Sequence, residues 1–391
     1  MPYQTCSARN VRHRHRHNFI TKRRLFVCAG RKGIFMIIKT SALMFLIVWS
    51  VALGQPSRLQ YRTITDMAGR TVKIPAVIKS VYSTSPMGEI IMYTLSPSMI
   101  AGTTWTLDSE EKSMLMDEYV KKPVLGGWFG KNTTGNPEVI IQAHPDMILS
   151  MGDIDKTSIS ASKRIEEKLG IPVVMIDGTL SSIDKTYRFL GDIINEKKRA
   201  DTLAEYCRST FDTIVSISSK IPYDKRIRVY YAEGTDGLQT DPKGTMHAEI
   251  IDIAGGINVA EVPALKGFGR ASVSFEQLLV WKPEIVLVCL DHGYAHDTEN
   301  YNNIVKSGSW HAIDAVAKGN IYCIPSIPFN WMDRPPSVNR IIGMRWLANL
   351  LYHDRFGMDI RKETEKFYAM FYHKKLTQVE LDIILKNAAH K

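Results

Sequence analysis

The chain has 391 residues, 45% of them apolar, so it is long enough for two or three globular domains with substantial cores. Its formal net charge is +10, and the ten basic residues among the first 54, a stretch without Asp or Glu, account for all of it. The rest of the chain carries 40 basic and 40 acidic residues. It lacks the basic excess that collects phosphates, so we expect no nucleic-acid partner.

Residues 1–54 have the composition of an export leader. A basic stretch is followed by an apolar run over 40–53 and by the small residue Gly54, which is the pattern of a secretory signal peptide. Met36 is a second candidate for the start of translation. The apolar run is short for a membrane span, although an uncleaved anchor stays open as an alternative. We expect an exported protein, periplasmic or at the cell surface.

The segment 62–182 predicts an N-terminal α/β lobe. It opens with a hairpin over 62–75 around the turn at Ala68 and Gly69. Strands and helices then alternate, namely strand 80–83, helix 89–95, strand 147–150, helix 160–169 and strand 172–177. Such alternation builds a parallel sheet that is covered on both faces.

Residues 183–220 predict one long connecting helix. They contain no Pro and one Gly, and their apolar positions recur every three or four residues. Such a helix would run about 55 Å, with a bend near Asn195. We interpret it as a rigid strut between two lobes of a monomer. The alternative is the arm of a coiled-coil dimer, although the heptad phase is not sustained.

Residues 221–391 predict a C-terminal α/β lobe with a helical tail. The expected elements are strands 227–231, 285–290 and 321–324, helices 248–254, 275–281 and 338–352, and tail helices 363–372 and 378–387. Cys207, Cys289 and Cys323 lack CxxC spacing, and we expect buried thiols and not a disulfide framework.

The two halves repeat each other. Segment 137–149 is echoed by 275–287: in each an acidic residue opens a short helix, a Pro follows it, and a second acidic residue leads into an apolar strand. A Glu-Ile-Ile triplet at 89–91 recurs at 249–251. We therefore expect the α/β class, with two parallel-sheet lobes joined by one long helix and a ligand cleft between them.

Several segments, in this order, resemble one family. They are Thr65 to Val72, Glu138 to Leu149, Gly170 to Val174, the long helix, Ile253 to Ala260 and Ser274 to Leu287. Together they resemble the substrate-binding proteins of ABC importers that carry iron-siderophores, haem and cobalamin, over roughly residues 62–353. The resemblance implies that the protein captures such a metal complex and delivers it to a membrane permease.

The resemblance also implies a docking role for two glutamates. In this family a surface Glu on each lobe contacts arginines of the permease, and Glu89 and Glu249 stand where those residues are expected. Two well separated carboxylates would fix orientation more than affinity. The alternative is that both are ordinary carboxylates at helix N-termini.

Ligand-binding residues are expected in the loops that follow the strands, because ligands of parallel α/β sheets bind there. Indole rings would form flat apolar walls for a chelate, guanidinium groups would bind carboxylate or oxyanion groups, and small polar side chains would add hydrogen bonds. The tryptophans are equally compatible with the core. The candidates are Trp105, Trp128, Trp331, Arg270, Arg334, Ser85 and Asn330.

Three further possibilities bear on function. His292 and His296 are weak candidates for a metal site, but Gly293 lies between them and a solvated loop is favoured, so no metal or other cofactor is expected. An oxyanion such as molybdate or tungstate is the alternative cargo. An enzyme on the same scaffold is the alternative of another class. We find no GxSxG, HExxH or P-loop motif, so no catalysis is expected.

Overall fold

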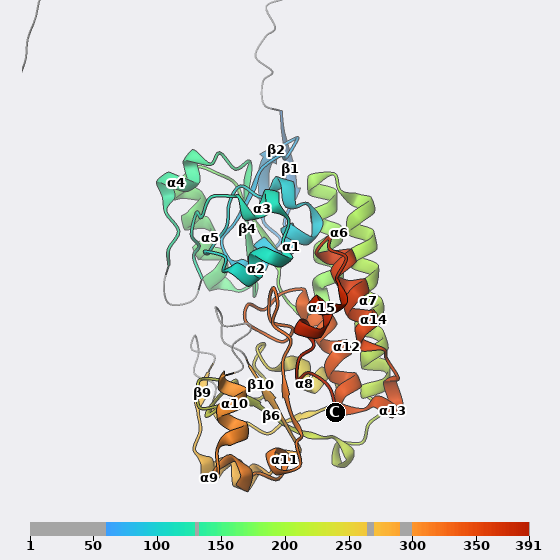
Figure 1. The fold of residues 1–391 in the computed structure, drawn as a ribbon. Coiled ribbons are helices and arrows are strands. Elements are labelled where there is room, and N and C mark those ends of the chain that lie inside the picture. Colours follow the sequence, from blue (N-terminus) through green and yellow to red (C-terminus); the bar gives the residue numbers. More distant parts are fainter. Residues whose placement is uncertain (1–59, 130–132, 264–269, 290–298, 391) are drawn as a thin grey trace, which may run out of the picture. The chain divides into compact units, whose positions relative to one another are not determined.

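The computed structural model describes residues 60–129, 133–263, 270–289 and 299–390 (Figure 1). The chain divides into two units, Met1–Pro56 and Ser57–Lys391, and every described residue belongs to the second. The predicted leader, with Met36, lies outside the described residues.

The described chain opens with the predicted hairpin. Strands β1 (Tyr61–Thr65) and β2 (Thr71–Pro75) pair antiparallel, with Thr65 opposite Thr71. The buried carboxylate of Asp66 accepts hydrogen bonds from the backbone N–H groups of Ala68 and Arg70, at 3.0 and 2.9 Å, which closes the turn. It also accepts one from Met175 N, at 3.1 Å. Asp66 therefore shapes the hairpin and attaches it to the first parallel sheet.

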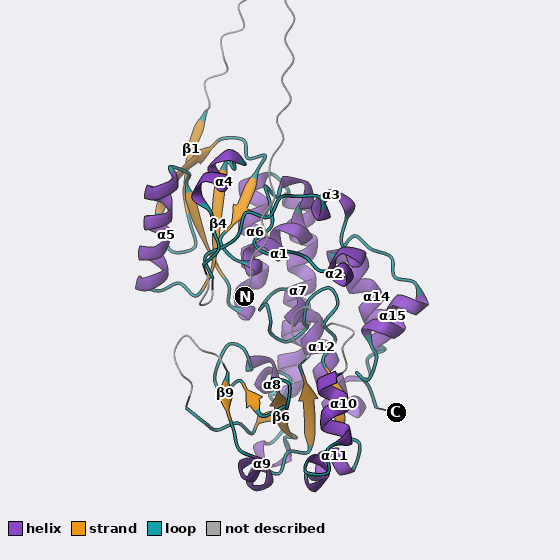
Figure 2. Ribbon diagram, turned by 60° about the vertical axis from the view of Figure 1, so that its left-hand side comes forward, coloured by secondary structure: helices purple, strands orange, loops and turns teal. Residues whose placement is uncertain are grey.

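The first parallel sheet has the order β3 (Val81–Ser83), β4 (Met147–Gly152), β5 (Val173–Asp177). Most of its side chains are buried, as expected of parallel strands covered on both faces. Helix α1 (Pro86–Leu95) contacts β3 and β4, helix α5 (Lys156–Leu169) contacts β5, and Figure 2 shows them on opposite faces. The remaining helices here are η1 (Pro97–Met99), α2 (Ser109–Met114), α3 (Asp117–Val120) and α4 (Pro137–Gln142).

The prediction of one continuous helix over 183–220 is wrong. After η2 (Leu180–Ser182), the segment forms α6 (Ile183–Ile194) and α7 (Lys197–Ser218), which pack against each other. Asn195 adopts the left-handed conformation, with φ of 62°, and ends α6. Gly191 makes the close approach possible, because a Cβ there would lie 2.3 Å from Cβ of Ala200. Helix α7 alone is about 33 Å long.

The second parallel sheet has the order β11 (Ile321–Cys323), β10 (Ile285–Val288), β6 (Arg228–Ala232), β8 (Ile257–Asn258). A small antiparallel sheet joins β7 (Gln239–Thr240) to β9 (Ala271–Ser272). The helices of this part are η3 (Tyr223–Lys225), α8 (Glu249–Ile253), α9 (Phe275–Trp281), α10 (Glu299–Lys306), η4 (Trp310–Ala312) and α11 (Asp314–Ala317). The predicted mixed α/β class with parallel sheets is confirmed.

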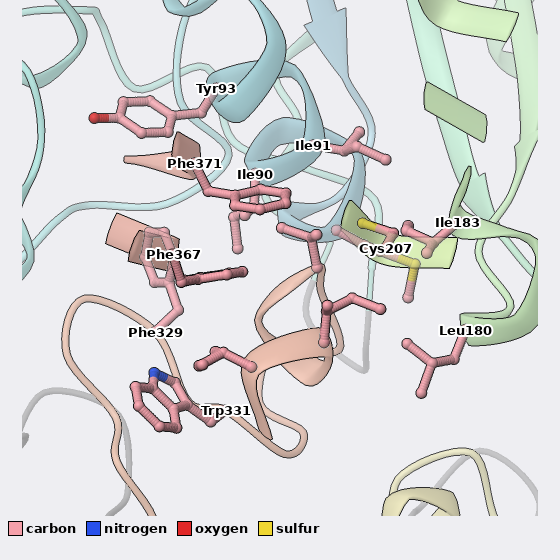
Figure 3. Close-up of a cluster of buried hydrophobic side chains, with 14 of the residues drawn as sticks. Ile90, Ile91, Tyr93, Leu180, Ile183, Cys207, Phe329, Trp331, Phe367 and Phe371 are labelled. Atoms are coloured by element: carbon pink, nitrogen blue, oxygen red, sulfur yellow. The ribbon is translucent and has the colours of Figure 1, made fainter. Parts of the chain in front are cut away.

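The C-terminal helices belong to both halves. They are α12 (Asn339–Leu351), α13 (His353–Phe356), α14 (Ile360–Phe371) and α15 (Gln378–Ile384). Helix α14 contacts α1, and the Tyr93 hydroxyl donates a hydrogen bond to Tyr372 O, at 3.3 Å. Figure 3 shows Ile90 and Phe371 in one buried cluster with Phe329. The tail therefore packs on the N-terminal lobe as well, and is not part of the C-terminal lobe alone.

Two chemical features complete the fold. Cys207, Cys289 and Cys323 are buried thiols, as expected, and burial raises the pKa of Cys207 and Cys323. Within the described ranges, none of the helices combines the length and apolar character needed to cross a membrane.

Candidate functional site

Six charged or titratable side chains from four segments of the C-terminal lobe converge. Glu233 directly follows β6, Asp241 follows β7, His247 precedes α8, and Arg270 precedes β9. The loop between β11 and α12 adds two more. We call the set the Arg334 cluster; its members are Glu233, Asp241, His247, Arg270, Asp333 and Arg334.

Arg334 lies at the centre of the cluster. Its Nε donates to Glu233 Oε1, at 3.0 Å, and its Nη2 donates to Asp241 Oδ2, at 2.6 Å. Asp333 Oδ2 is also 3.2 Å from Arg334 Nε. Arg270 Nε donates to the same Glu233 oxygen, at 2.8 Å. The two guanidinium groups predicted to bind ligand therefore do come together, and both are held by buried carboxylates.

His247 is oriented by Asp333, because the ring Nδ1 and Asp333 Oδ1 share a hydrogen bond. Asp333 is in turn held by Asn330, whose side-chain oxygen accepts hydrogen bonds from the N–H groups of Met332 and Asp333. The imidazole and both guanidinium groups are about a quarter exposed, whereas the three carboxylates are fully buried. The basic groups therefore form the accessible part of the cluster.

The carboxylates of the cluster outnumber its guanidinium groups. Three carboxylates face two guanidinium groups, so the formal charge is −1 when His247 is neutral. Burial and the nearby charge of Asp241 raise the pKa of Glu233 to about 7. Burial also raises the pKa of Asp241, although the charge of Arg334 opposes this. Burial lowers the pKa of His247, but the hydrogen bond to Asp333 and its charge outweigh burial and raise it.

Several carboxylate oxygens of the cluster are left without donors. Glu233 Oε2, Asp241 Oδ1 and Asp333 Oδ2 accept no hydrogen bond from a donor in the described part of the chain. Glu233 and Asp241 are close enough to share a proton, which would satisfy one oxygen of each. Unsatisfied buried oxygens are costly in a folded protein. The cluster is therefore set up to take a proton, a cation or a ligand donor.

Trp331 and Asn330 are not ligand contacts, contrary to prediction. The Trp331 ring is fully buried in the hydrophobic core (Figure 3). Asn330 is 3% exposed, and its side chain bonds to the backbone of its own loop and to Ser326 Oγ, at 3.2 Å. Both residues build the loop that places Asp333 and Arg334, so their contribution to the site is indirect.

The N-terminal candidates are spread over different contacts. Trp105 is partly buried, donates a hydrogen bond to Glu111 at 3.3 Å, and packs edge-on against Phe329 at 5.6 Å between ring centroids. Trp128 is partly buried and packs edge-on against Tyr82. Ser85 precedes α1 without capping it through its side chain. Within the described part of the chain, the hydrogen bonds and ring contacts of Trp105 and Trp128 are made with residues outside the Arg334 cluster. His292 and His296 lie outside the described residues.

Glu89 is not a surface residue, so its predicted docking role is wrong. It is 1% exposed: Oε2 accepts a hydrogen bond from Thr104 N, at 2.6 Å, and Oε1 accepts one from the Tyr119 hydroxyl. Burial raises the pKa of Glu89 to about 7, and these two hydrogen bonds oppose the rise. A carboxylate enclosed in this way cannot reach a partner protein.

Glu249, unlike Glu89, is partly exposed, and its carboxylate pairs with a buried arginine. It forms an ion pair with the Arg340 guanidinium, a buried group that also donates from Nη2 to Gly178 O, at 3.1 Å. Gly178 follows β5 of the first sheet, so Arg340 links Glu249 to the N-terminal lobe. Burial raises the pKa of Glu249, and the charge of Arg340 opposes this. The Glu249 side chain is nevertheless 34% exposed, so its docking role stays a prediction.

The repeated segment presents a better matched pair of glutamates. Glu138 is the second residue of α4 and Glu276 the second residue of α9, and both are exposed. Ile140 and Leu278, two positions later, are both fully buried. The next residue in each copy is an exposed apolar one, Ile141 at 44% and Leu279 at 42%. Each lobe therefore carries the same small surface, one carboxylate beside one apolar side chain.

The match extends to the backbone that follows. His144 and Lys282 stand at equivalent positions, and each has φ of 48°. Asp146 Oδ2 then accepts from Ser80 N, at 2.9 Å, and Glu284 Oε2 accepts from Arg228 N, at 3.0 Å. The same chain reversal thus directs a strand into each sheet. The sequence already shows the echo that contains Glu138 and Glu276. The docking prediction instead concerns the Glu-Ile-Ile triplets.

Comparisons with known proteins agree with this architecture. The family model described as periplasmic binding protein matches residues 80–328. Because the match covers more than half of the chain, the chain belongs to the periplasmic binding protein family. Members of this family bind solutes, and the protein is a solute-binding protein of the kind that serves ABC transporters. A comparison with curated proteins finds no match.

Solved structures show the same fold. An ABC transporter solute-binding protein from Sulfurospirillum deleyianum is 28% identical, with a TM-score of 0.76 over 83% of this chain and 99% of that one. A periplasmic solute-binding protein from Veillonella parvula is 23% identical, with a TM-score of 0.69 over 84% and 98%. The molybdate-binding protein MolA of Haemophilus influenzae, bound to molybdate, is 22% identical, with a TM-score of 0.62 over 81% and 99%.

Proposed function

We propose that the protein captures a metal complex of the iron-siderophore, haem or cobalamin type outside the cytoplasm and delivers it to an ABC permease. The charge of the Arg334 cluster is the observation that supports this choice of cargo. Its two partly exposed guanidinium groups suit carboxylate or other anionic groups of a chelator. Its buried carboxylates, which outnumber the guanidinium groups, suit the positive charge of a metal.

A small oxyanion fits the cluster less well. Molybdate would place its negative charge beside Glu233, Asp241 and Asp333, and the N–H groups of Arg334 nearest to them are already used. The Haemophilus protein binds molybdate, but at 22% identity the likeness extends to the fold only. Molybdate is therefore the comparison ligand for the test.

Cargo is tested by native mass spectrometry with elemental analysis of protein purified from its own host. Equilibrium binding of ferric siderophores, haem, cobalamin and molybdate follows. We expect a metal complex to bind at least tenfold more tightly than molybdate. Arg270→Lys, which loses the guanidinium fork, should weaken that binding roughly tenfold. The matched control Arg164→Lys, on the exposed face of α5, should not. Selective binding of molybdate would refute the proposed cargo.

We further propose that the permease contacts the paired surfaces at Glu138 with Ile141 and Glu276 with Leu279. The support is their equivalence, because both copies expose a carboxylate and an apolar side chain on a helix anchored by a buried residue. Two such carboxylates, one in each lobe, suit a basic partner that must bind in a defined orientation.

Charge reversal tests the docking surface. The double variant Glu138→Arg, Glu276→Arg should keep its affinity for cargo and lose uptake by roughly tenfold or more, since like charges across an interface are strongly unfavourable. Glu167→Arg on α5 is the matched control, because Glu167 is exposed and forms an exposed ion pair with Lys163, at 3.8 Å. Uptake at the parental rate by the double variant would exclude this surface.

A further inference from the structure

The geometry points to a divalent transition-metal site formed by Asp241, His247 and Asp333. These residues come from two loops of the C-terminal lobe: Asp241 and His247 lie between β7 and α8, and Asp333 lies between β11 and α12. One potential ligand atom from each lies within 4.8 Å of the other two. Ligand atoms on one ion, each about 2.0–2.2 Å from it, lie up to roughly 4.4 Å apart. Small side-chain adjustments would therefore bring all three onto a single ion.

A second observation points to a cation at the same place. Asp241 and Asp333 are fully buried, and Asp241 Oδ1 and Asp333 Oδ2 accept no hydrogen bond from the residues that the structure describes. Arg334 Nε lies 3.2 Å from Asp333 Oδ2, but the N–H group at Nε donates to Glu233 Oε1. Arg334 Nη2 donates to Asp241 Oδ2. Buried oxygens without a donor are rare in native proteins. A metal ion would satisfy both carboxylates together.

The ligand set indicates the class of metal. One imidazole and two carboxylates, without a thiolate, suit borderline divalent ions such as Ni²⁺, Co²⁺ and Zn²⁺ better than a soft ion such as Cu⁺. The cluster is also prepared for coordination: Asn330 fixes the Asp333 backbone, and Asp333 contacts the His247 ring. The partly exposed imidazole gives the ion a route from solvent.

The neighbouring charges suggest how the ion would be used. A dication would change the formal charge of the Arg334 cluster from −1 to +1 and would leave coordination positions open to donors from another molecule. Arg270 and Arg334 could then hold anionic groups of that molecule. This use rests on the proposed function, in which a metal complex is the cargo. Binding of the ion by the chain itself does not depend on it.

The test uses the purified chain and the chlorides of Ni²⁺, Co²⁺ and Zn²⁺ alone. We expect one equivalent to bind by calorimetry, and Co²⁺ to show the absorption bands of an ion with nitrogen and oxygen ligands. His247→Ala should weaken binding at least tenfold, and Asp241→Asn should do the same. His353→Ala is the matched control, because His353 is exposed on α13. Thermal unfolding would show whether each variant is folded.

The outcomes separate the two proposals. Absence of binding at millimolar metal, or parental affinity in a folded His247→Ala protein, would overturn the metal site. If a variant does not fold, the absorption spectrum of Co²⁺ added to the parent protein tests the site. Bands of a Co²⁺ ion coordinated by water alone would overturn the metal site. A chain that binds the ions through His247 but takes up no metal complex would retain the site and refute the proposed cargo.

Discussion

Replacing Glu89 with glutamine tests whether this carboxylate is a buried structural group. Burial raises the pKa of Glu89 from 4.5 to about 7. Between these values the folded protein holds a proton that the unfolded chain has released, so the free energy of unfolding falls as pH rises and becomes level above about pH 7. At 1.36 kcal/mol for each pKa unit, the loss is about 3 kcal/mol.

Glutamine at position 89 removes this pH dependence of the free energy of unfolding and keeps the shape of the side chain. Its oxygen can accept from Thr104 N, and its amide can donate to the Tyr119 hydroxyl. We expect Glu89→Gln to gain up to about 3 kcal/mol relative to the parent between pH 4.5 and 8. Urea unfolding at a series of pH values measures the difference. Glu111, whose pKa burial also raises to about 7, is present in both proteins, and its charge is one cause of the raised pKa of Glu89.

Two results would refute this reasoning. Parallel stability curves for Glu89→Gln and the parent would show that Glu89 titrates normally. Loss of uptake by a stable Glu89→Gln protein would show that the carboxylate meets a partner after all. The burial of Glu89 predicts unchanged uptake.

Two further predictions concern the framework of the site. A Cβ at Gly343 in α12 would lie 1.9 Å from Trp331 O, so Gly343→Ala should lower the free energy of unfolding by about 3 kcal/mol. Gly308→Ala, in open space, should leave urea unfolding unchanged, and equal stabilities would refute the packing argument. Asp66→Ala should cost about 3–5 kcal/mol, because it removes one partner of a buried ion pair. The exposed Asp117→Ala should cost less than about 0.5 kcal/mol, and a similar cost for both would contradict the role of Asp66.

Much of the scaffold could be predicted from local sequence. Apolar runs such as 285–288 form buried parallel strands whichever lobe they enter. The hairpin follows from Asp66 and Gly69, since the carboxylate closes a turn within four residues and Gly69 adopts φ of 75°. The echo of 137–149 in 275–287 does reflect a repeated structure, because its helix start, chain reversal and acidic residue are local features.

The errors concern side-chain packing and turns that tertiary contacts decide. Helical periodicity continues through 183–220, but whether Asn195 turns the chain depends on α7 packing back against α6. A glutamate at the start of a helix is exposed in many proteins, and Glu89 is buried because Thr104 and Tyr119 close over it. Trp331 lies in a loop that is rich in proline, yet its ring packs in the core that both lobes share.

The sequence by itself thus determined the class of protein: the alternating elements, the duplicated helix-to-strand segment and the family they resemble. The tertiary structure decided which charged residues meet. Arg270 and Arg334 could be chosen as loop arginines from the sequence, but their carboxylate partners and His247 could not. These groups are brought together by strand ends and loops up to about a hundred residues apart, through contacts that exist only once the second sheet has formed.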